Sequence, residues 1–195
     1  MRLEVTPMNE KNSRWDSVYS NSAARVPGKE IPLPTFIDCA EQFPARGRCL
    51  EIACGQGQTA VWLARRGMDV YGVDLSPVAI AQARMLATNA GVSEHCHFEV
   101  HDLDAGLPDT PPVDLLLCHK FRDTRLYPAM KARLAPGGML AIVVLSEVDA
   151  KPGRFRAKAG ELQHAFGGMQ IVSQGEKDGL GWLVGRMSDA TSGKN

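Results

Sequence analysis

Residues 50–60 read Leu-Glu-Ile-Ala-Cys-Gly-Gln-Gly-Gln-Thr-Ala, and this stretch decides the fold prediction. It begins as a short apolar run and continues into a segment whose apolar residues have helical spacing, so its glycines fall between a strand and a helix. Glycine at such a junction lets a ligand approach the backbone, and the first turn of the helix offers unpaired N–H groups. We therefore expect a ligand-binding loop between these two elements.

Acidic residues end the next two predicted strands. Asp74 lies in the apolar run 70–75, and Asp102 follows the alternating segment that starts at residue 95. A carboxylate at the first of these places can accept hydrogen bonds from both hydroxyls of a ribose. Ligands of open α/β sheets bind outside the carboxyl ends of the strands, so the loop and both carboxylates should line one crevice.

The remaining pattern completes a sheet. Strands and helices alternate after residue 49, which predicts parallel strands with right-handed crossovers. Segment 95–102 alternates like an edge strand, whereas runs 113–118 and 139–145 are continuously apolar and predict central strands. Segments 169–176 and 180–187 flank Lys-Asp-Gly and predict an antiparallel hairpin. The predicted fold class is α/β, a Rossmann-like seven-stranded sheet, mostly parallel, with helices on both faces.

Length and composition favour one neutral domain. The chain has 195 residues, 22 basic and 22 acidic, and it is 44% apolar. A neutral chain favours neither nucleic acid nor an anionic membrane as a partner. The N-terminus lacks a signal-peptide pattern, no apolar run is long enough to span a bilayer, and the five cysteines form no C-x-x-C pair. We expect a cytoplasmic protein with reduced cysteines; its oligomeric state does not follow from the sequence.

The segment 50–57 resembles the first motif of the class I S-adenosylmethionine-dependent methyltransferases, an acidic residue followed by a glycine-rich loop. Ala53 stands where that motif usually has its first glycine. The resemblance continues through Val-Asp-Leu-Ser at 73–76, His-Asp-Leu at 101–103 and Leu-Ala-Pro-Gly-Gly at 134–138. The segment 15–19, Trp-Asp-Ser-Val-Tyr, and Gly-Glu-Leu at 160–162 resemble small methyltransferases of the tellurite-resistance and thiopurine type.

This resemblance implies S-adenosyl-L-methionine as cofactor and in-line methyl transfer to a small-molecule acceptor, without nucleic-acid or membrane partners. It divides the chain into an N-terminal arm and helix that form a lid (1–46), a cofactor-binding methyltransferase domain (47–188) and a disordered tail (189–195). The implied cofactor contacts are Glu51, Ala53, Gly55 and Gly57 around the methionine part, Asp74 on the ribose with Leu75 against the adenine, Asp102 on the adenine amino group with Leu103 alongside, Cys118 near the sulfonium, and Trp15 and Tyr19 in the lid.

His119 is the candidate general base, because it ends the predicted fourth strand and an ordinary histidine accepts a proton near neutral pH. A histidine that only packs or binds backbone is the alternative. No metal site is expected: His95, His97 and His101 share a strand face, but the outer pair would lie roughly 20 Å apart. Two loops should border the acceptor and steer an anionic one, unless interspersed acidic residues simply balance them; their basic residues are Lys120, Arg122 and Arg125, and Lys151, Arg154, Arg156 and Lys158.

Two other functions remain open at this point. Gly55, Gly57 and Ala60 also satisfy the dinucleotide fingerprint G-x-G-x-x-G/A, which would fit a small NAD(P)-dependent oxidoreductase. Against it, the chain is too short for a further substrate domain, and no Tyr-x-x-x-Lys pair follows the fourth strand. A non-catalytic cofactor-binding module is the third possibility, because Ala53 departs from the usual loop.

Overall fold

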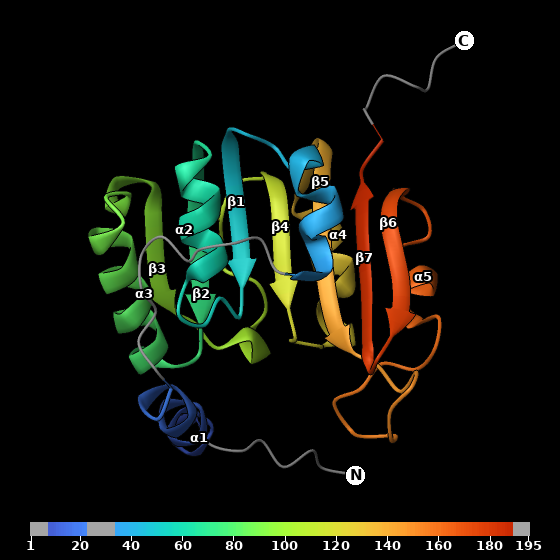
Figure 1. The fold of residues 1–195 in the computed structure, drawn as a ribbon, viewed down its shortest axis with the longest axis horizontal. Helices are drawn as coiled ribbons and strands as arrows, with labels where there is room; N and C mark the ends of the chain where they lie inside the picture. The colour runs from blue at the N-terminus through green and yellow to red at the C-terminus, as the bar shows by residue number, and fades with distance from the viewer. Residues whose placement is uncertain (1–7, 23–33, 189–195) are drawn as a thin grey trace.

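The computed structural model describes residues 8–22 and 34–188. A seven-stranded sheet runs through it in the order β3-β2-β1-β4-β5-β7-β6 (Figure 1). Strands β1 to β5 pair in parallel, and β7 is antiparallel to both β5 and β6. This confirms the predicted fold class. The strands are β1 (Gly47–Ile52), β2 (Met68–Asp74), β3 (Cys96–Val100), β4 (Val113–His119), β5 (Leu134–Leu145), β6 (Gln170–Lys177) and β7 (Leu180–Arg186).

Helices cover both faces of the sheet. One core packs α2, α3 and η1 against one face, and a second core packs α4 and α5 against the other. Successive residues of β4 divide between them, with Leu115 and Leu117 in the first core and Leu116 in the second. The helices are α1 (Met8–Ser20), α2 (Gln58–Arg65), α3 (Pro77–Asn89), α4 (Tyr127–Ala132) and α5 (Glu161–Phe166), with 3₁₀ helices η1 (Pro34–Gln42), η2 (Ser93–His95), η3 (Leu103–Ala105) and η4 (Thr124–Leu126).

Two local predictions differ from the structure. The helix expected in the arm 1–46 is present before β1, but as the 3₁₀ helix η1; Phe36 within it and Phe43 just after it are buried, with ring centroids 5.8 Å apart. Strand β3 lies at the sheet edge as predicted, yet Val100 is 38% exposed instead of sharing the dry face of Cys96 and Phe98. Val100 is the last residue of β3, where it pairs with Asp74 at the end of β2.

Candidate functional site

The glycine-rich loop joins β1 to α2 through a left-handed backbone. Its φ angles are 51° at Ala53, 53° at Gly55 and 73° at Gly57. Ala53 adopts this conformation at a cost of roughly 1–2 kcal/mol, which glycine at the same place would avoid. Gly57 has a second constraint, because an added Cβ would lie 2.8 Å from the Ala83 Cβ and 3.0 Å from the Phe98 ring. The loop therefore holds its shape against α3 and β3.

Asp74, at the end of β2, ties this loop to the start of α3. Its Oδ2 accepts the Gly55 N–H at 2.9 Å, and its Oδ1 accepts the Ser76 N–H at 3.0 Å. Burial raises the pKa of Asp74, while these backbone hydrogen bonds oppose the rise. A third backbone hydrogen bond comes from Leu75; because a carboxylate has about four lone-pair sites, the group can still accept from a ligand.

Glu51 lies at the end of β1 and is 3% exposed. Its Oε2 has no hydrogen-bond partner among the described residues. Burial raises the pKa of Glu51 to about 8, a backbone hydrogen bond from Ala60 lowers it, and the charge of Asp74 raises it further. A buried oxygen without a donor is costly, so this position suits a ligand that brings a cationic donor.

Helix α1 packs over the same loops. The Asp16 carboxylate accepts from the Ser76 hydroxyl and from the Val78 N–H, which is 3.4 Å away, so α1 is fastened to the N-terminus of α3. Gln82 donates to the Tyr19 carbonyl at 3.2 Å. Figure 1 shows α1 beyond the carboxyl end of β2, next to the start of α3. The sequence analysis quoted Asp16 within the segment 15–19 but gave it no role, and it missed Gln82, which no local pattern marks.

The two predicted lid aromatics lie differently. Tyr19 rests on the glycine loop, since a Cβ added at Gly55 would be 3.0 Å from its hydroxyl. Burial, then the nearby Asp74 carboxylate, raises the pKa of Tyr19, so its hydroxyl stays protonated. Trp15 is 45% exposed, with its ring centroid 6.3 Å from that of Tyr19. Tyr19 alone therefore reaches the loop.

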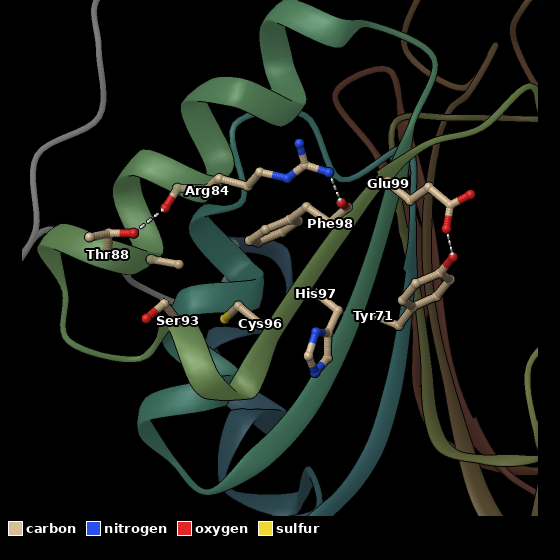
Figure 2. Close-up of a pocket in the computed structure, with 9 residues that line it drawn as sticks. Tyr71, Arg84, Thr88, Ser93, Cys96, His97, Phe98 and Glu99 are labelled. Carbon is tan, nitrogen blue, oxygen red and sulfur yellow. Dashed lines mark hydrogen bonds between the residues drawn. The ribbon is translucent and has the colours of Figure 1, made fainter.

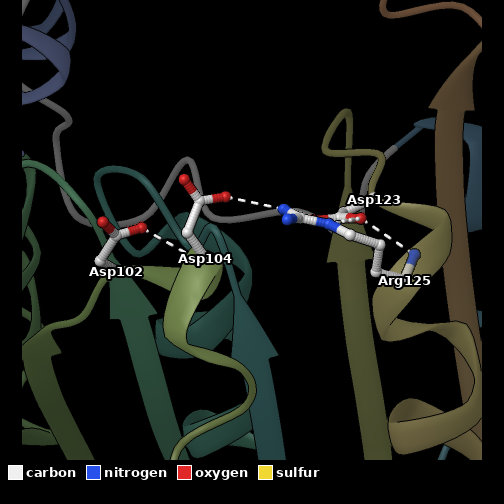
Figure 3. A network of polar contacts seen from close by, with 4 residues as sticks. All are labelled: Asp102, Asp104, Asp123 and Arg125. Carbon is white, nitrogen blue, oxygen red and sulfur yellow. Dashed lines mark hydrogen bonds and ion pairs between the residues drawn. The ribbon is translucent and has the colours of Figure 1, made fainter. Parts of the chain in front are cut away.

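Asp102 and Leu103 begin the segment after β3. The Oδ1 of Asp102 accepts the Asp104 N–H at 2.9 Å and so caps η3, while Leu103 is buried in the second core. Figure 3 shows Arg125 reaching from η4 towards this segment, with 2.8 Å to Asp104 and 2.5 Å to Asp123. These contacts join the loops after β3 and β4, which the sequence placed at one edge.

Cys118 and His119 end β4 on opposite faces. The Cys118 thiol is 1% exposed in the second core and donates to the Phe121 carbonyl at 3.3 Å, so its side chain points into the protein. His119 is partly buried. Burial, and then the charge of Lys120, lowers the pKa of His119 to about 4. Its imidazole is therefore neutral at pH 7 and a weaker base than an ordinary histidine.

Comparison with known proteins finds relatives similar in sequence and solved structures similar in fold. Residues 49–138, just under half of the chain, match the family described as "Methyltransferase domain". A protein-L-isoaspartate O-methyltransferase of Anaeromyxobacter dehalogenans is 32% identical over 120 residues, 60% of this chain and 57% of that protein. The tRNA 5-carboxymethoxyuridine methyltransferase of Escherichia coli K12 is 34% identical over 112 residues, 53% of this chain and 42% of that protein. The chain thus spans about half the length of the curated relatives it matches.

The solved structure of TehB from Haemophilus influenzae superposes with a TM-score of 0.71 at 17% identity, covering 91% of this chain and 67% of TehB. The fold is that of the class I methyltransferases, and residues 49–138 match a methyltransferase domain. This confirms the class, and with it S-adenosylmethionine as cofactor, predicted from residues 51–57. In the described parts of the chain, no helix has the length and apolar character needed to cross a membrane.

Three of the predicted steering residues bind carboxylates or backbone carbonyls of this same chain. Arg122 pairs with both oxygens of Glu161 at 2.7 and 2.6 Å, which holds the pKa of Glu161 below its usual range. Arg125 pairs with two aspartates, as described above. Arg156 donates to the carbonyls of Ser146 at 2.6 Å and Gly179 at 3.1 Å. The other four predicted steering residues, Lys120, Lys151, Arg154 and Lys158, are exposed.

A separate pocket lies beside the edge strand β3 (Figure 2). Tyr71 donates to Glu99 there, and Arg84 donates to the Phe98 carbonyl at 2.5 Å. It borders the flank of the sheet and includes Ser93, which precedes β3, so it differs from the crevice at the carboxyl ends. No group of three or more potential metal-binding side chains occurs within residues 8–22 and 34–188.

Proposed function

We propose that this chain transfers the methyl group of S-adenosyl-L-methionine to a small-molecule acceptor by in-line displacement. When bound, the cofactor supplies an electrophilic methyl group on its sulfonium. The observation that carries the proposal is the buried Glu51 carboxyl, whose Oε2 has no partner in the described chain, at the start of a loop with glycine at 55 and 57. An ammonium group of the cofactor would donate a hydrogen bond to that oxygen. Because the glycines have no side chain, the methionine part can lie close to the backbone of the loop.

The other cofactor contacts fit the same arrangement. Asp74 holds the loop through Gly55 and keeps lone pairs for the ribose hydroxyls. Asp102 uses Oδ1 to cap η3, which leaves its Oδ2 for the adenine amino group. Leu75 and Leu103 would flank the adenine. Because the side chain of Cys118 is turned inward, we assign its cofactor contact to the backbone, as for Ala53.

We propose that the arm 1–46 acts as a lid on the domain 47–188. Its support is α1, fastened by Asp16 to the start of α3 and resting on the glycine loop through Tyr19. A closed lid excludes water, which favours displacement at the methyl carbon. Residues 1–7 and 23–33 of this arm and the tail 189–195 lie outside the described part.

We propose His119 as the residue that could act as a general base. A general base works best with a pKa near the working pH, and burial takes His119 to about 4. Such a group removes a proton slowly from a phenol or an ammonium. The proposed acceptor is therefore one that ionises by itself, such as a thiol or a chalcogen acid, for which the protein supplies position and a dry site.

A small acceptor is proposed although relatives bear names of tRNA and protein methyltransferases. The net charge of zero offers no general attraction for nucleic acid. All five cysteines are free and buried, which agrees with the proposed cytoplasmic site of action. Labelled S-adenosylmethionine with separate pools of small metabolites, tRNA and protein tests the acceptor class directly; label entering only tRNA or protein would overturn the small-molecule assignment.

Thermal unfolding tests the cofactor site. S-adenosylhomocysteine at about 100 times its Kd should raise Tm by roughly 5–11 °C, and NAD should not. Glu51→Gln and Asp74→Asn should reduce the shift, whereas Glu94→Gln, an exposed carboxylate change at the other end of the sheet, should retain it. A shift with NAD alone would restore the oxidoreductase hypothesis. Binding without methyl transfer to any pool would favour a non-catalytic module.

A further inference from the structure

The loop between β5 and α5 carries an exposed aromatic residue where the acceptor is expected. Figure 1 shows this loop beyond the carboxyl end of β5, at the same edge of the sheet as α1 and to its right. Phe155 is 60% exposed. Arg154 lies over its ring, with the guanidinium carbon 5.6 Å from the ring centroid. The exposed ring leaves apolar surface open to contact with a bound molecule, and the stacked guanidinium adds a charge beside it.

The turn that carries these two side chains is held at its base. The Arg156 N–H donates to the Gly153 carbonyl at 2.9 Å and closes the turn. The Arg156 side chain reaches two carbonyls, those of Ser146 and Gly179, and so binds the loop to the β6–β7 turn. Next to it, Ala157 donates to the Leu145 carbonyl at 2.7 Å and is buried. Arg154 and Phe155 are therefore presented outward by an anchored turn.

The charge of this loop is positive. Residues 147–160 contain four basic and two acidic residues, a net charge of +2 in a chain whose total is zero. Of the acidic pair, Asp149 accepts the Asp178 N–H at 3.2 Å, which directs its carboxylate to the β6–β7 turn. A guanidinium stacked on an aromatic ring offers a flat surface and donors that match a carboxylate.

We propose that Arg154 and Phe155 recognise the methyl acceptor as a planar anion, the ring of Phe155 contacting its face and Arg154 its negative group. This inference rests on the proposed function and names the chemical class of its acceptor. Arg156 is a positioning residue, because it holds the turn and uses its donors on backbone carbonyls. A count of charges alone would treat the two arginines alike, whereas the structure separates them.

The test uses 4-hydroxybenzoate, a planar anion, as probe, with its neutral amide and with cyclohexanecarboxylate as matched compounds. Dissociation constants are measured by titration calorimetry on the full chain, with and without saturating S-adenosylhomocysteine. The planar anion should bind more tightly than either matched compound. Arg154→Gln and Phe155→Ala should each weaken it about five- to tenfold. Arg46→Gln and Met85→Ala, equivalent changes at exposed residues outside this loop, should leave it unchanged.

The proposal would be overturned if the three compounds bind with equal affinity, or if neither variant changes the affinity for the planar anion. It would also be overturned if the chain methylates tRNA or protein and both variants abolish that transfer. S-adenosylhomocysteine binding is measured on the same samples and should not change in either variant. Failure of the wild type to bind S-adenosylhomocysteine would count against the proposed function, while the probe measured without it still tests Arg154 and Phe155. The two failures are thus distinguishable.

Discussion

Gly57→Ala offers the sharpest test of how the cofactor loop is built. At φ 73° the new side chain would be in the left-handed region, which costs roughly 1–2 kcal/mol. Its Cβ would also lie 2.8 Å from the Ala83 Cβ and 3.0 Å from the Phe98 ring, and such overpacking costs roughly 1–3 kcal/mol more. We expect the free energy of unfolding to fall by about 2–5 kcal/mol.

Gly91→Ala is the matched control. Its φ of 71° imposes the same backbone strain, but an added Cβ meets no atom within 4 Å. Both changes restrict the unfolded chain equally, so that effect cancels in the comparison. Urea denaturation followed by circular dichroism should show Gly57→Ala about 1–3 kcal/mol less stable than Gly91→Ala. Equal losses would refute the close packing of the loop. Weaker binding of S-adenosylhomocysteine is expected for Gly57→Ala alone.

Three further outcomes follow from single contacts. Because the pKa of Glu51 is raised to about 8 in the folded protein, its contribution to stability is present below pH 4.5 and is lost as the pH rises to about 8. In Glu51→Gln, the free energy of unfolding measured with urea should therefore change less between pH 5 and 8 than in the wild type. Parallel pH profiles for wild type and variant would contradict this. Asp16→Ala should release α1 and speed tryptic cleavage after Arg14 roughly fivefold, and an unchanged rate would count against the fastening contact. Arg156→Gln should lower the free energy of unfolding by about 1–3 kcal/mol and increase amide hydrogen exchange in residues 146–157. Unchanged exchange would contradict the role of Arg156 as an anchor of this loop.

The sheet and the cofactor loop were predictable because both depend on local patterns. Apolar periodicity separates strands from helices, and glycine marks the backbone at Gly55 and Gly57 where left-handed angles are needed. Asp74 followed from its place at a strand end, since parallel strands bring their carboxyl ends to one edge. The left-handed Ala53 was not predictable in this way, because an alanine gives no signal of a positive φ.

Contacts between distant segments could not be predicted. Asp16 meets Ser76 across 60 positions, and Arg122 meets Glu161 across 39. Each residue looks like ordinary surface charge until the fold brings its partner near. The pKa of His119 could not be predicted for the same reason. Its place at the end of β4 followed from the sequence, but its lowered pKa depends first on burial, which only the fold determines.

Arg154 and Arg156 show what the fold adds to a count of charges. In sequence they are two similar cations on one polar loop, and both were expected to steer an anion. Pairing of Ala157 with the end of β5 fixes the side chain of Arg156 over two backbone carbonyls, which uses its donors inside the protein. Arg154, two residues earlier, lies on the exposed ring of Phe155. Reversing the charge at both positions together would mix a loss of loop structure with a loss of recognition, so only the separate substitutions can assign the acceptor site.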